Sequence, residues 1–352
     1  MNFANNTKKF VEEFGFYIFI LFSTFLISIF ESIFPKHESL EGLYARALVL
    51  EKTIEEKLST LSKGGDIYSG NIYIALASFI LFFIITGSLI LFLFRFFKIL
   101  KSKKPLIKSS NFSPYPLWGL KDFFKIVIWI LFWAQVLGLS DEFFRRFYRM
   151  YTEREYIVIA LLSSLFLDII IIAMLVYWLK KHCRQNLQAV GIHKENLFKK
   201  FNFAAFNYFS FLPIIFIAVF ISAVYLQKYQ AVSSPQTIIY FLLFEKNPWI
   251  VMLTVLFIVV IGPFMEELLF RGLLYNSLKK SIGYMQAMIA ASLLFSLLHM
   301  NVIGFLPILI LALLFTYLYE KTGSLMVSVF VHMLHNGFLI FIIFILRVYL
   351  RI

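Results

Sequence analysis

Long apolar runs alternate along the chain with short polar or basic segments. Nine runs are close to the length of about 20 residues that a helix needs to cross a bilayer. These predicted spans cover residues 14–30, 72–94, 123–139, 156–179, 206–226, 249–278, 284–300, 305–319 and 325–346. Residues 40–62 mix apolar with charged positions, which is typical of a helix outside the bilayer. The pattern predicts an all-α, polytopic transmembrane helix bundle with about eight to nine spans.

Composition supports a membrane protein. Of the 352 residues, 61% are hydrophobic and 15% are charged, whereas soluble domains average about 45–50% and about 25%. This excess excludes a soluble enzyme, a DNA-binding domain and a disordered chain. Lysine and arginine number 33 against 20 acids, a net charge of +13. In a membrane protein this charge indicates loops that face anionic lipid, so we expect lipid rather than nucleic acid as a partner.

The basic residues also predict the orientation. They cluster after the predicted spans 72–94, 156–179 and 249–278. All these clusters fall on one side if the N-terminus is cytoplasmic, as the positive-inside rule requires. We therefore expect a multi-pass protein of the bacterial plasma membrane with a cytoplasmic N-terminus. Cys183 is the only cysteine, which excludes an internal disulfide and a cysteine-based metal site.

Charged residues inside an apolar run are costly and therefore mark candidate functional positions. Glu266, Glu267 and Arg271 lie near the middle of the run 249–278. On a helix Glu267 and Arg271 share a face, because they are four residues apart, while Glu266 points elsewhere. We expect Arg271 to neutralise Glu267 as a buried pair and Glu266 to remain free. Pro263, just before the acids, permits a bend. The alternative is one charge cluster that ties helices together.

Histidines in the last spans are the second candidate signal. His299 ends one run, and His332 and Asn336 lie four residues apart on one face of another; His335 lies to the other side. A carboxylate with a histidine can deprotonate water, and a histidine with an amide can stabilise an oxyanion. One glutamate and two histidines are also a zinc-hydrolase ligand set. The residues alone leave both chemistries open, although the chain has no His-Glu-x-x-His motif.

The three candidate groups resemble the motifs of a known family in order, spacing and flanking residues. They are Glu266-Glu267-x-x-x-Arg271, Phe295-x-x-x-His299 and His332-x-x-x-Asn336. The chain is thereby similar to the CPBP intramembrane proteases, which include the CAAX prenyl endopeptidases of the Rce1 type, the Abi proteins and lysostaphin-resistance-like proteins. The resemblance covers residues 262–337, whereas residues 1–245 resemble nothing identified.

The resemblance implies a division of roles. Glu266 and His299 would activate water, His332 and Asn336 would stabilise the oxyanion, and Glu267 and Arg271 would support the site. It implies an intramembrane endopeptidase acting on a membrane-associated peptide or protein, such as a prenylated or leader-type substrate. We expect no cofactor, although a zinc-dependent protease remains an alternative. The predicted domains are an N-terminal transmembrane region, 1–245, and a catalytic core, 246–352.

Two alternatives come from other functional classes. One is a catalytically inactive immunity or regulatory protein of the same fold. The other is a transporter, in which Asp168 of the run 156–179 would join Glu266 and Arg271 in an ion pathway. Asp168 itself has two interpretations, a functional acid or a protonated acid that pairs helices. Straight helices with the predicted bounds would hold His299 and His332 too far apart for one site.

Overall fold

The computed structural model describes residues 72–101, 117–148, 153–229, 237–302 and 304–350, and within them every regular element is a helix. The longer helices are α3 (Ile72–Lys101), α4 (Leu120–Tyr148), α5 (Glu153–Lys181), α6 (Leu197–Tyr229), α11 (Tyr284–Leu298), α12 (Phe305–Thr322) and α13 (Leu325–Leu350). The shorter ones are η1 (Leu187–Val190), α7 (Thr237–Phe244), α8 (Pro248–Leu256), η2 (Phe257–Ile261), α9 (Gly262–Glu267), η3 (Leu268–Tyr275) and α10 (Asn276–Ile282). The all-α prediction is confirmed.

Six helical stretches among the described residues are long and apolar enough to cross a membrane. They are Phe79–Lys98, Val158–Lys181, Leu197–Tyr225, Pro248–Ile282, Phe305–Thr322 and Leu325–Val348. Each matches one predicted span, so the chain is a multi-pass membrane protein. The predicted span 123–139 lies within α4, which is not one of the six. The run 284–300 forms α11, whose 15 residues are fewer than a full crossing requires. The predicted span 14–30 and helix 40–62 lie outside the described residues.

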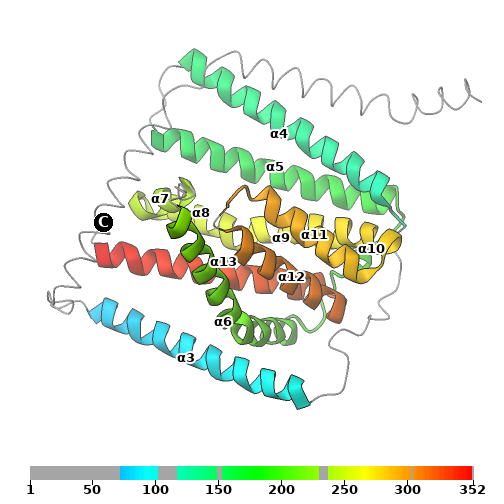
Figure 1. Cartoon of the computed structure of the whole chain (residues 1–352). Helices are drawn as coiled ribbons and strands as arrows, with labels where there is room; N and C mark the ends of the chain where they lie inside the picture. The colour runs from blue at the N-terminus through cyan, green and yellow to red at the C-terminus, as the bar shows by residue number, and fades with distance from the viewer. Residues whose placement is uncertain (1–71, 102–116, 149–152, 230–236, 303, 351–352) are drawn as a thin grey trace, which may run out of the picture.

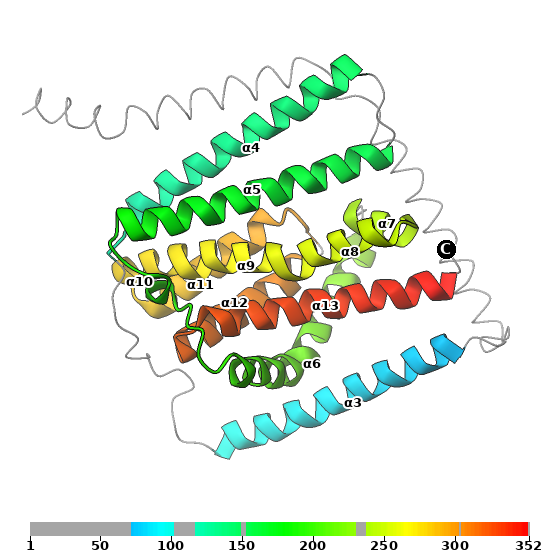
Figure 2. The same cartoon turned by 180° about the vertical axis from the view of Figure 1, so that it is seen from behind.

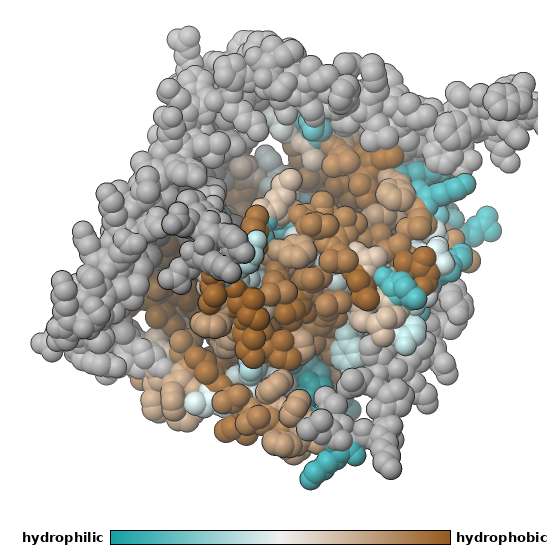
Figure 3. Space-filling model, in the orientation of Figure 1, coloured by the Kyte–Doolittle hydropathy of each residue, from teal (hydrophilic) through white to brown (hydrophobic). Residues whose placement is uncertain are grey.

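Helix α13 occupies the centre of the bundle. It contacts α3, α6, α7, α9 and α12, and Figures 1 and 2 show α4 and α5 on one side of it and α3 on the other. Apolar residues cover most of the described surface seen in Figure 3. In water such a surface would be unstable, but in a bilayer it contacts lipid tails of matching polarity. The central position of α13 buries Val327, Val331 and His332 inside the protein, whereas Leu339 and Leu346 nearer its C-terminus are exposed.

Several helix ends that carry basic residues gather at one end of the bundle. These ends are the C-termini of α3, α5 and α10 and the N-terminus of α6, on the right of Figure 1. Their lysines are Lys98, Lys101, Lys180, Lys181, Lys199, Lys200, Lys279 and Lys280. This grouping is what the positive-inside rule requires of a cytoplasmic face.

The stretch Pro248–Ile282 is a continuous helix with two changes of winding. The segments η2 and η3 are π-helical, and the short α-helix α9 lies between them. Pro263 lies in the first turn of α9 but inside the continuous helix, so its missing N–H leaves a carbonyl of the preceding segment η2 without its helical partner. A π-helical turn shifts the side chains around the helix axis and is frequent at functional sites. Both predicted site glutamates lie in α9, between these two irregular segments.

The loop after α5 is anchored in the core of the bundle. The backbone N–H of Leu325 donates to the carbonyl of Gly191 (2.9 Å), and the Tyr319 hydroxyl donates to the carbonyl of Val190 (3.2 Å). Gly191 has φ +84°, and a Cβ there would lie 2.7 Å from the carbonyl oxygen of Gly323. Only glycine fits this position. The predicted domain boundary at residue 245 stays a prediction. The loop after α5 precedes that boundary and is hydrogen-bonded to Tyr319 and Leu325, which follow it.

Candidate active site

A buried ion pair forms the base of the site. Arg271 Nη1 donates to Glu267 Oε1 at 2.9 Å, and the two side chains are 1% and 0% exposed. The residues lie on α9 and η3, one helical turn apart, so the pair predicted from their spacing is present. Two opposite charges held together in this way avoid the cost of leaving either one alone in an apolar interior.

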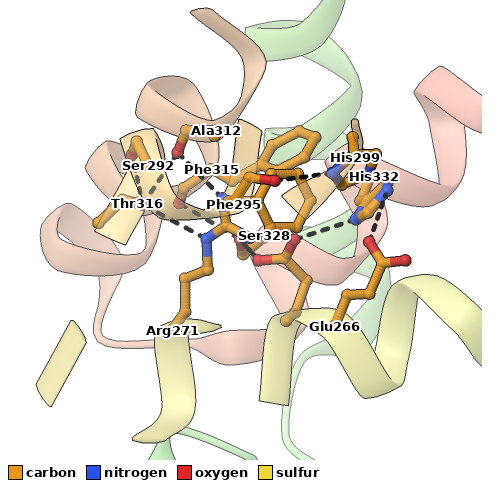
Figure 4. A network of polar contacts seen from close by, with 11 residues as sticks. Glu266, Arg271, Ser292, Phe295, His299, Ala312, Phe315, Thr316, Ser328 and His332 are labelled. Atoms are coloured by element: carbon orange, nitrogen blue, oxygen red, sulfur yellow. Dashed lines mark hydrogen bonds and ion pairs between the residues drawn. The ribbon is translucent and has the colours of Figure 1, made fainter. Parts of the chain in front are cut away.

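Two other guanidinium nitrogens of Arg271 donate hydrogen bonds to α12. Arg271 Nη2 donates to the carbonyl of Ala312 (3.1 Å), and Nε donates to Thr316 Oγ1 (3.3 Å). The rings of Phe295 and Phe315 lie 4.5 and 5.2 Å from the guanidinium carbon, within the range of cation–π attraction. Figure 4 shows these contacts around Arg271. Arg271 is thus fixed by two neighbouring helices, and it fixes Glu267 in turn.

Glu267 also binds two residues of α13. Ser328 Oγ donates to Glu267 Oε2 (2.5 Å), and His332 Nδ1 lies 3.0 Å from Glu267 Oε1. Both carboxylate oxygens are therefore occupied. The contact to His332 was not predicted from the sequence, and Ser328 was missed. The sequence offers one signal for Ser328 as a site residue, which is its position four residues before His332 on the same face of the helix.

The imidazole of His332 lies between the two glutamates. Its Nδ1 faces Glu267, and its Nε2 lies 3.8 Å from Glu266 Oε2 (Figure 4). The ring also stacks on Phe315, with 4.8 Å between the centroids. Glu266 Oε2 has no hydrogen-bond partner among the described residues, and the side chain of Glu266 is 36% exposed. As predicted, Glu266 lies outside the ion pair.

His299 approaches the same region from the end of α11. It is the C-cap of that helix, and its Nδ1 lies 2.7 Å from the carbonyl oxygen of Phe295. The Phe295 ring lies 4.6 Å from the His299 ring and 6.0 Å from the His332 ring, centroid to centroid. Both histidines therefore border one phenylalanine. The separation expected from straight helices does not arise, because α11 is short and inclined to α13 (Figure 1).

Asn336 lies one turn beyond His332 and contacts the interrupted helix. Its Nδ2 donates to the carbonyl of Ile258 (2.8 Å) in the π-helical segment η2. One hydrogen of Nδ2 is thereby used, and the other remains for a further acceptor. His335 points to a different neighbour, with its Nδ1 3.3 Å from the Tyr208 hydroxyl. His335 is therefore separate from the contacts around Glu267.

Glu266, His299 and His332 are the zinc-ligand set that the sequence left open. Among the described residues, no three His, Cys, Asp or Glu side chains converge as metal ligands do. The Nδ1 atoms of His299 and His332 already face a carbonyl and a carboxylate, which leaves only their Nε2 atoms as possible ligands.

Fold and site together define a multi-pass membrane protein with a buried cluster of glutamates and histidines on its apolar helices. Residues 248–338 match the protein family described as "Type II CAAX prenyl endopeptidase Rce1-like". The resemblance found from the three motifs is confirmed over this region.

Two curated proteins are similar to the same part of the chain. Membrane-embedded CAAX protease MroQ of Staphylococcus aureus (strain USA300) is 34% identical over 93 residues, which are 24% of this chain and 37% of that protein. Putative membrane peptidase YdiL of Bacillus subtilis (strain 168) is 26% identical over 81 residues, 23% of this chain and 33% of that protein. The aligned segment thus spans about a third of the length of these relatives. No solved structure matches the chain.

Proposed function

We propose that the chain is a membrane-embedded CAAX-type endopeptidase that hydrolyses a peptide bond of a membrane-associated substrate. The proposal rests on the position of the His332 imidazole between two glutamates. Its Nδ1 contacts Glu267, and its Nε2 faces Glu266. Charged groups gathered inside a membrane bundle are functional by default. The match of residues 248–338 to the Rce1-like family supports peptide hydrolysis as that function.

In the proposed reaction, Glu266 and His299 activate a water molecule. The carbonyl of Phe295 can only accept a hydrogen bond, so Nδ1 of His299 carries the hydrogen and Nε2 is free to accept one. Glu266, whose Oε2 lacks a hydrogen-bond partner within the described helices, takes the proton from the water. The hydroxide attacks the peptide carbonyl, and the C–N bond then breaks as the proton passes to the leaving amine.

His332 and Asn336 stabilise the oxyanion that forms during this attack. Because Nδ1 of His332 donates to Glu267, its Nε2 can donate only when the ring carries both protons. The pairing of Glu267 with Arg271 keeps a carboxylate available to hold that doubly protonated ring. The second hydrogen on Nδ2 of Asn336 supplies the other hydrogen bond. Glu267 and Arg271 act as positioning residues, since they reach the substrate only through His332.

The proposed reaction needs no metal, because a carboxylate and an imidazole suffice to activate water. We expect peptide cleavage to survive long incubation with EDTA or phenanthroline, and the purified protein to contain no stoichiometric zinc by elemental analysis. If the protein instead contains one zinc per chain, and chelation abolishes an activity that added zinc restores, a zinc-dependent mechanism replaces this one. His332→Ala would then also lose the metal.

The active form is proposed to lie in a bacterial plasma membrane with its N-terminus in the cytoplasm. The grouping of lysine-rich helix ends at one end of the bundle supports this orientation. Lipid surrounds the apolar helices, and the substrate is a peptide or a membrane protein, such as a prenylated or leader-type chain. Nucleic acid is not among the proposed partners.

To identify the substrate, cells that express the wild-type protein are compared with cells that express the variant Glu266→Ala. We expect new peptide termini, measured by mass spectrometry of membrane fractions, to appear only with the wild type. An equal set of termini in both strains would contradict the proposal. It would instead favour the alternative of an inactive immunity or regulatory protein of the same fold.

A further inference from the structure

Asp168 is a buried acid that the proposed mechanism does not use. It lies in the middle of α5 and is 9% exposed. Leu161, Ile171 and Leu175 are 5%, 1% and 0% exposed and follow a helical spacing with Asp168. Asp168 is therefore part of the face that α5 turns toward the protein, and not of the face in contact with lipid.

This face of α5 packs against the helix that carries Glu266. Helix α5 contacts α9 and η2, and the two views in Figures 1 and 2 both show α5 beside this helix. Ile171 and Leu175 share a cluster of buried side chains with Leu268, which directly follows α9. The carboxyl group of Asp168 lies close enough to interact electrostatically with Glu266. Asp168 thus borders the candidate site from a helix outside the matched segment 248–338.

Among the described residues, a count of charges leaves Asp168 without a counterion. Arg271 balances Glu267 (2.9 Å), and His332 balances Glu266 when its ring is doubly protonated. Within the described parts of the chain, the Asp168 carboxyl group makes no hydrogen bond and no ion pair with lysine or arginine. An ionised Asp168 would therefore add a second negative charge near Glu266 that no described cation balances.

We propose that Asp168 is a substrate-positioning residue that pairs with a lysine or arginine side chain of the substrate near the scissile bond. The proposal rests on the proposed peptidase function. A cation of the substrate would supply the missing counterion and would be attracted into an apolar region where few other groups can bind it. A substrate with an acidic residue at that place would be rejected by Asp168 and Glu266 together.

The test uses the full-length protein in liposomes and synthetic lipid-anchored peptides of one sequence. Single positions on either side of the central bond carry Lys, Arg, Gln or Glu in turn, and mass spectrometry measures cleavage. For the wild type we expect one position at which Lys or Arg lowers KM about tenfold relative to Gln, with little change in kcat. Asp168→Asn should lose this preference, so that its KM values for the Lys, Arg and Gln peptides become equal.

Two control variants separate charge from structure. Asp168→Glu keeps the carboxylate and should restore part of the preference for Lys or Arg. Glu195→Gln removes an acid from an exposed loop and should behave as the wild type. Unchanged KM values in Asp168→Asn, or an effect on kcat alone for every peptide, would overturn the proposal. Unchanged KM values are also the result expected if Asp168 is protonated and only pairs helices.

A binding measurement separates this proposal from the proposed function. Affinity of the Lys and Gln peptides is measured by fluorescence anisotropy for Glu266→Gln with and without Asp168→Asn. We expect the Lys peptide to bind more tightly only where Asp168 is present, and equal binding in both proteins would overturn its role. If Glu266→Gln cleaves the peptides as fast as the wild type, the peptidase mechanism fails, while the binding result still decides the role of Asp168.

Discussion

Replacing Glu266 with glutamine is expected to lower the rate of peptide cleavage by about 10²–10⁴-fold, the usual contribution of a general base. The substitution keeps the volume of the side chain and removes its ability to take a proton from water. The fold should tolerate it, because the Glu266 side chain is 36% exposed and its Oε2 makes no hydrogen bond to the described residues. We therefore expect normal membrane insertion, yield and thermal stability.

The measurement compares cleavage of a substrate peptide by purified wild type and Glu266→Gln in the same liposomes. Glu195→Gln is the matched control, since it makes the same chemical change in an exposed loop far along the chain from α9. It should retain full activity. Full activity in Glu266→Gln would remove Glu266 from the mechanism. A loss of activity together with a loss of thermal stability would indicate a structural role instead.

The helices could be predicted from the sequence because lipid imposes a simple rule on them. A segment in the bilayer must satisfy its own backbone hydrogen bonds, so every long apolar run becomes a helix. The run 284–300 agrees with α11 to within two residues, but the 15 residues of α11 are fewer than the full crossing that was predicted for it. The inclination of α11 depends on packing between helices and is not encoded in one segment. It decides where His299 lies.

The charged part of the site could be predicted because charges stand out in an apolar run. The spacing of Glu267 and Arg271 was sufficient to predict their ion pair. The hydroxyl groups could not be predicted in the same way. Ser328 and Thr316 look like ordinary packing residues of apolar helices, and only the three-dimensional structure shows that they bind Glu267 and Arg271.

The π-helical segments could not be predicted from the sequence either. Pro263 indicated an irregularity here, and the structure places π-helical turns before and after α9. Asn336 of α13 donates to the carbonyl of Ile258 within the first of these turns. Asn336 was predicted as a site residue from its spacing to His332. Its contact with η2 shows that it also holds the interrupted helix against α13.

Breaking the buried ion pair is expected to have the largest effect on stability. Arg271→Met removes the guanidinium, so that Glu267, at 0% exposure, loses its arginine counterion and keeps only its contacts with Ser328 and His332. Loss of one partner from such a pair costs about 3–5 kcal/mol. The variant also loses the hydrogen bonds to Ala312 and Thr316. We expect a lower melting temperature and a lower yield of purified protein, together with loss of activity, because Glu267 holds His332.

A double variant distinguishes the charge from the packing of the side chains. Glu267→Gln/Arg271→Met carries neither charge, so no ion is left unpaired, and it should be more stable than Arg271→Met alone. It should remain inactive, because an amide in place of Glu267 can accept the hydrogen bond from His332 but lacks the negative charge that stabilises a doubly protonated ring. Thermal unfolding in detergent, followed by tryptophan fluorescence, gives the three stabilities needed for the comparison. If the double variant is as unstable as Arg271→Met, the hydrogen bonds to α12 and α13 dominate, and the ion pair contributes little.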